Sequence, residues 1–65
     1  MTGFNPGENV WGRGGEGIIW PITINGYRDE GHRRVYQAEI NFGAPTGTLF
    51  DFSEWDVARY KTYFG

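Results

Sequence analysis

The segment RRVYQAEINF, residues 33–42, alternates between apolar and polar side chains. Every second residue from Tyr36 to Phe42 is apolar, and the residues between them are polar. This period of two is typical of a β-strand that buries one face and exposes the other. A chain of only 65 residues buries no more than about 60% of the surface that its unfolded form exposes. The sequence therefore predicts one small β-domain over residues 1–65, with a core made of large side chains.

Other extended segments are separated by residues that favour turns. Gly, Pro, Asn and Asp gather between short runs rich in Ile, Val, Thr, Tyr, Phe and Trp, which is the composition of strands joined by turns. We expect strands over residues 8–13, 17–25, 33–42, 47–52 and 57–62. The polar segment GYRDEGHR, before the third of these strands, is expected to be a projecting loop.

The segment SEWDVARYKTYF, residues 53–64, suits either a helix or a short turn followed by a strand. Ser53 could cap a helix, with Asp56 three residues further on. We favour a single 3-10 turn over residues 53–56 and a last strand after it. Five short strands with one turn before the last predict a small SH3-like barrel, which also removes exposed sheet edges.

Composition argues against several classes of protein. The chain has no cysteine, and its only histidine is His32, so we expect no disulfide, metal site or bound cofactor. The net charge of −2 argues against a nucleic-acid binder that is basic over its whole surface. The N-terminal residues lack the apolar core of a signal peptide, and no apolar run approaches the ~18 residues of a membrane span. We therefore expect an intracellular protein without a membrane partner.

The stretch GENVWGRGGEGIIWPITI, residues 7–24, resembles the start of a PWWP domain. These domains belong to the Tudor-like, or royal, group of SH3-like barrels. Trp11 aligns with the Val-Trp motif of the family, and Trp20 with Pro21 aligns with its Trp-Pro motif. Further on, Phe42-Gly43 is similar to the strand that ends in Phe-Phe-Gly, and FSEWDVARY is similar to the closing segment.

The resemblance covers roughly residues 4–60 and implies a cage of aromatic rings for methylated lysine, held by cation–π attraction. Trp20 and Phe42 match two cage positions. The other usual aromatic position falls on Gly17, and the position that often supplies an acid falls on Ala44.

Three aromatic residues are candidate partner contacts: Trp20 at the centre, with Trp11 and Phe42 beside it. Trp20 lies next to a glycine-rich turn, but under simple alternation it shares a face with Ile22, so it is either a contact or a core residue. Trp11 should point away from the core or across a barrel end, and Phe42 also suits the interior. Trp55, after the turn, is expected to plug the barrel.

Three basic residues complete the candidate surface: Arg28, Arg33 and Arg34. Arginine matches the geometry of phosphate oxygens, so these residues would suit nucleic acid as well as an acidic protein. The adjacent Asp29 and Glu30 offer a plainer alternative, in which the arginines pair with carboxylates of the same loop.

No catalytic constellation stands out in the sequence. GRGGEG lacks the Lys-Ser/Thr that completes a phosphate-binding loop. We interpret the acids Asp51, Glu54 and Asp56 as residues of a solvent-exposed turn. We therefore expect a small binding module for a protein or nucleic acid, able to form a homo-oligomer. One alternative is an oligomeric SH3-like-barrel enzyme whose active site forms between subunits. Another is a phage or mobile-element protein that inhibits a host enzyme.

Overall fold

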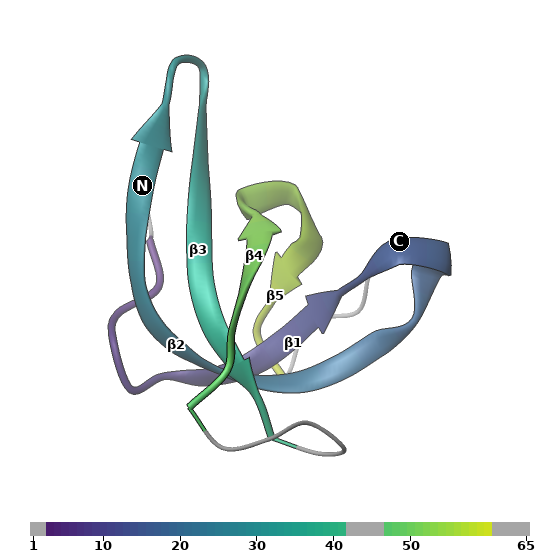
Figure 1. The fold of residues 1–65 in the computed structure, drawn as a ribbon. Coiled ribbons are helices and arrows are strands. Elements are labelled where there is room, and N and C mark those ends of the chain that lie inside the picture. The colour runs from purple at the N-terminus through teal and green to yellow at the C-terminus, as the bar shows by residue number, and fades with distance from the viewer. Residues whose placement is uncertain (1–2, 42–46, 61–65) are drawn as a thin grey trace.

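A computed structural model describes residues 3–41 and 47–60 of the chain (Figure 1). Five strands form one antiparallel sheet in the order β4-β3-β2-β1-β5. The strands are β1 (Asn9–Arg13), β2 (Ile19–Glu30), β3 (Arg33–Ile40), β4 (Leu49–Ser53) and β5 (Val57–Ala58), with 3-10 turns η1 (Gly15–Gly17) and η2 (Glu54–Asp56). The expectation of five antiparallel strands with a 3-10 turn before the last is confirmed.

The long strand β2 curves and takes part in both halves of the sheet (Figure 1). Its first half pairs with β1, and the part from Gly26 onward pairs with β3 alone. The register shifts between Ile24 and Gly26, where one extra residue forms a bulge. A bulge bends a strand and increases its twist, so β2 can curl the sheet around the core.

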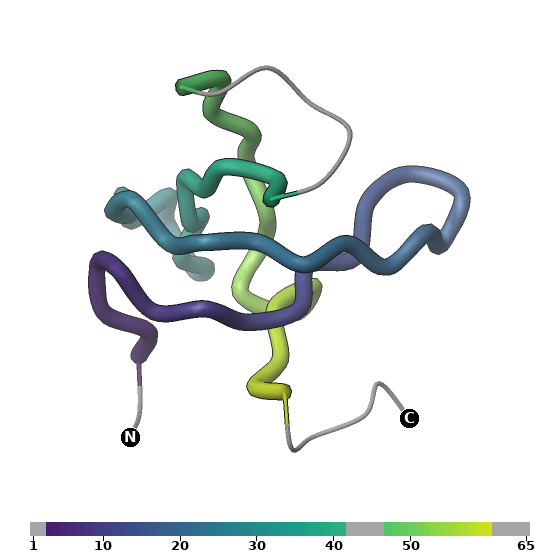
Figure 2. The backbone as a smooth tube through the Cα atoms, turned by 90° about the horizontal axis from the view of Figure 1, so that it is seen from below, coloured from purple at the N-terminus to yellow at the C-terminus, as the bar shows by residue number. Residues whose placement is uncertain are grey.

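The curled sheet brings β4 over β1. In Figure 2 the chain from β4 to β5 crosses the paired strands β1 and β2 at a steep angle. A Cβ atom added at Gly12 of β1 would lie 2.9 Å from Cε1 of Phe52 on β4 and 2.7 Å from Cδ1 of Ile22. A larger residue at this position would therefore require the Ile22 and Phe52 side chains to shift. Within the described parts of the chain, no ladder joins β4 to β5, so both are edge strands and the sheet is not closed. The expectation that the fold removes exposed sheet edges is therefore wrong for these residues.

The core lies on the inner face of this curled sheet. Tyr36 is the largest fully buried side chain, and its hydroxyl accepts a hydrogen bond of 3.1 Å from the backbone N–H of Phe4. The Phe4 ring meets the Tyr36 ring edge to face at 5.3 Å, so the N-terminal segment closes one end of the core. The buried apolar residues of this core are Val10, Ile22, Ile24, Tyr36, Ala38, Phe52 and Val57.

The prediction of a loop over residues 26–33 is wrong. β2 and β3 continue through this polar segment as a hairpin, and Glu30 pairs with Arg33 across a turn formed by Gly31 and His32. Gly31 has a φ of +61°, which glycine adopts without the penalty of a side chain. Backbone ladder bonds and ion pairs between β2 and β3 hold this hairpin, and neither produces an apolar alternation in the sequence.

The end of the described chain also differs from expectation. β5 ends at Ala58, and Arg59 and Tyr60 lie outside it, whereas the sequence predicted a strand reaching Thr62. Trp55 does not plug the interior, because 58% of its surface is exposed. It belongs to the short turn η2, which turns the indole outward.

Candidate functional site

Trp11 and Trp20 lie on opposite faces of the sheet. Trp20 pairs with Gly12 across β1 and β2 and shares the inner face with Ile22, as expected. Trp11 pairs with Pro21 on the outer face and points away from the core, also as expected. The sheet therefore does not place the two indoles on one contact surface. The third aromatic candidate, Phe42, and the cage position at Ala44 lie outside the described residues.

Both tryptophans contact other parts of the fold: the Trp20 indole lies next to the backbone at Gly14, and the Trp11 indole lies next to the Tyr60 ring. Trp20 is half-buried and packs against the core, and its Nε1 lies 3.2 Å from where a Cβ at Gly14 would be. The Trp11 ring packs against Tyr60 at a tilt of 45°, with centroids 4.6 Å apart. These contacts agree with a structural role for both residues, which the sequence left open for Trp20.

The three candidate arginines all lie on the β2–β3 hairpin, but on two faces. Arg34 is two residues from the buried Tyr36, so it continues the inner face, whereas Arg28 and Arg33 lie on the outer face. Arg28 follows Trp20 by eight residues on β2, which is about 25 Å along an extended strand. The structure therefore separates the basic candidates from the aromatic ones.

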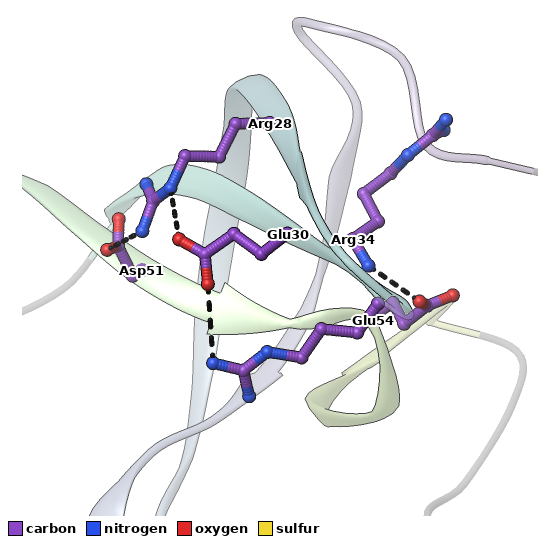
Figure 3. A network of polar contacts seen from close by, with 6 residues as sticks. Arg28, Glu30, Arg34, Asp51 and Glu54 are labelled. Carbon is purple, nitrogen blue, oxygen red and sulfur yellow. Dashed lines mark hydrogen bonds and ion pairs between the residues drawn. The ribbon is translucent and has the colours of Figure 1, made fainter.

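All three arginines pair with carboxylates, as the plainer alternative predicted. Figure 3 shows the pairs that Arg28 forms with Glu30 and Asp51. Arg28 contacts Glu30 at 2.6 Å and Asp51 on β4 at 2.9 Å, and Arg33 contacts Glu30 at 3.5 Å. The hydrogen bonds from Arg28 lower the pKa of Glu30 and of Asp51 below their ordinary values. The same bonds raise the pKa of the Arg28 guanidinium.

Arg34 is held separately from this network. Its Nε donates to Asp29 at 3.0 Å, and this bond raises the pKa of the guanidinium. The guanidinium also stands 3.8 Å from the centroid of the Tyr27 ring, a cation–π contact. Arg34 is therefore already occupied by an acid and an aromatic ring.

The turn η2 lies against the hairpin and is held from two sides. The backbone N–H of Arg34 donates to Glu54 Oε1 at 2.7 Å (Figure 3). From β1, Arg13 pairs with Asp56 at 3.0 Å and donates to the carbonyl of Trp55 at 3.4 Å. The backbone of η2 is fixed by these contacts, while the Trp55 side chain remains exposed.

An open cavity of about 320 Å³ lies between the hairpin turn and η2. The Trp55 ring stands beside it, with its centroid 6.4 Å from that of His32. We call this region the tip surface, and it consists of Asp29, Gly31, His32, Arg33, Arg34, Glu54 and Trp55. Two of the predicted site residues, Arg33 and Arg34, belong to it.

The sequence prediction missed Trp55 and His32 as site residues. One signal was available: Trp55 is flanked by Glu54 and Asp56 in a short turn, and a tryptophan between two acids is poorly placed to enter a core. No comparable signal marks His32, because its proximity to Trp55 depends on how η2 lies against the hairpin.

The structure is that of a small all-β protein with a five-stranded antiparallel sheet. Comparison with protein-family models, with curated proteins and with solved structures finds no match to this chain. Within residues 3–41 and 47–60, no helix is long and apolar enough to cross a membrane. In the same residues, His, Asp and Glu form no group that could hold a metal ion.

Proposed function

We propose that this chain is a small protein-binding module built on an SH3-like barrel of the Tudor-like type, and that it contacts its partner through the tip surface. The strand order β4-β3-β2-β1-β5, the bulged β2 shared by both halves of the sheet and the 3-10 turn before β5 support the barrel. The contact across the core between Gly12 and Phe52 supports it too.

The observation that carries the function is the exposure of Trp55. A tryptophan that is 58% exposed leaves a large apolar ring in water, although burial of such rings is a main source of stability in a chain this small. Its backbone is fixed by Arg13 and by the hydrogen bond between Glu54 and Arg34. Tryptophans on rigid elements are frequent centres of protein–protein interfaces, since they lose little conformational entropy on binding.

The charges favour a protein over nucleic acid. Every arginine in the described part of the chain pairs with a carboxylate: Arg13, Arg28, Arg33, Arg34 and Arg59. A phosphate would have to displace these acids, and the net charge of −2 gives no general attraction to a polyanion. The proposal keeps the predicted class of binding module and moves its centre from Trp20 to Trp55.

The test is a selection of peptides from a random display library on the immobilised chain. Trp55→Ala should lose the selected peptides and remain folded, because the side chain contributes little to the core. Ile19→Ala is the matched control: Ile19 is 41% exposed and belongs to the part of β2 that pairs with β1. It should leave binding unchanged.

Two results would reject the proposal. In one, the selected peptides bind Trp55→Ala as well as they bind the parent chain. In the other, no peptide is selected, while a 12-nucleotide single strand or a 12-base-pair duplex quenches the tryptophan fluorescence of the parent chain on titration and does not quench that of Trp55→Ala. The second result would place the chain among nucleic-acid-binding proteins.

A further inference from the structure

The charged groups around the tip surface leave one carboxylate without a cation. On the outer face, Arg28 and Arg33 are balanced by Glu30 and Asp51, and we call these four residues the outer network. Arg34 is balanced by Asp29. Glu54 remains. Its carboxylate accepts a hydrogen bond from the backbone N–H of Arg34, which is a neutral donor. Among the residues that the structure describes, Glu54 forms no ion pair.

Glu54 also shares the tip surface with the exposed ring of Trp55. It lines the cavity between the hairpin turn and η2, and Trp55 follows it directly in the chain. The electron-rich face of an indole attracts a cation at short range, and a neighbouring carboxylate adds to the attraction. An anion would meet the opposite situation, because Arg33 and Arg34 are already engaged and Glu54 would repel it.

We propose that the tip surface binds a lysine or arginine side chain of the partner protein, held between the indole of Trp55 and the carboxylate of Glu54. This inference rests on the proposed function and adds the chemistry of the ligand. The sequence suggested a basic surface that recognises acids or phosphates. The inference reverses the charge of the site: an acidic and aromatic site on this chain recognises a basic side chain of the partner.

The experiment uses the peptides selected above for dependence on Trp55, with dissociation constants measured by fluorescence anisotropy at pH 7.5. We expect them to be enriched in Lys or Arg. Glu54→Gln should weaken their binding by roughly tenfold, the lower end of what a hydrogen bond to a charged group contributes. The variant removes the charge and keeps a side-chain oxygen that can accept the bond from the N–H of Arg34, so we expect it to fold. Replacing the critical Arg of a peptide by citrulline should cause a similar loss.

Glu16→Gln is the matched control, because it makes the same change in net charge at an exposed position in η1. It should leave the dissociation constants within about twofold, since exposed charges beyond a Debye length of about 8 Å are largely screened.

Peptides that depend on Trp55 but contain no basic residue, or that bind Glu54→Gln as well as the parent chain, would overturn the inference and leave the proposed function standing. If Glu16→Gln weakens binding as much as Glu54→Gln, the effect is one of net charge and the specific site is rejected. If no peptide depends on Trp55, both proposals fail together.

Discussion

Trp20 is the residue whose role the sequence left most open, and its contacts favour the core. We expect Trp20→Ala to lower the free energy of unfolding by about 3 kcal/mol, the low end for truncation of a large aromatic, because the side chain packs on the core but is only half-buried. Urea unfolding followed by circular dichroism measures this. Ile19→Ala, at the adjacent exposed position, should change the free energy little. An unchanged stability of Trp20→Ala would return this indole to the list of contact residues.

Single residues also show where sequence reasoning stops. The direction of Trp11 could be predicted, because it follows the buried Val10 on a strand with a period of two. The direction of Trp55 could not be derived in the same way. It belongs to a three-residue turn that has no periodicity, and its exposure depends on how Arg13 and Glu54 fix that turn.

The β2–β3 hairpin is the element that the tip surface depends on. Its turn requires a positive φ at Gly31, where an alanine would be strained by about 1–2 kcal/mol although no atom lies within 4 Å of the added Cβ. We expect Gly31→Ala to loosen the end of the hairpin and weaken the binding of the selected peptides. Amide hydrogen exchange should become faster between Arg28 and Val35. Gly15→Ala adds a methyl group that also meets no atom, without a positive φ, and should leave this exchange unchanged.

This hairpin also explains why the sequence predicted one of its strands and took part of the other for a loop. The strand ending in Phe42 was found because one of its faces is apolar, and its described part, β3, lies where expected. The outer half of β2 was taken for a loop because its side chains form ion pairs within β2 and with β3 and β4 instead of packing on a core. The link between Arg28 and Asp51 depends on the register of β3 with β4, and spacing in the sequence does not reveal that register.

The charge balance of the whole molecule determines how it responds to acid. Glu30 and Asp51 have a lower pKa in the folded chain than their ordinary values of 4.5 and 3.8, chiefly because Arg28 donates hydrogen bonds to both. Between the folded and unfolded pKa values, the unfolded chain binds more protons, so stability rises with pH there. The contribution is complete above the unfolded values and is lost as the pH falls through the folded ones.

We therefore expect the free energy of unfolding to fall as the pH is lowered from 5 to 3, and to fall less steeply in Arg28→Met. This variant removes the donor from Asp51 and the closer of the two donors from Glu30, which keeps Arg33 at 3.5 Å. Urea unfolding at half-unit intervals of pH gives the two slopes. Raising the salt concentration to about 1 M should bring the slopes closer, because these groups are exposed and salt screens them. Equal slopes at low salt would mean that Glu30 and Asp51 titrate alike in both states, and that the outer network contributes nothing to acid stability. The same network leaves Glu54 as the uncompensated acid of the tip, so Arg28→Met also tests whether the partner's base is drawn to Glu54 or to freed carboxylates nearby.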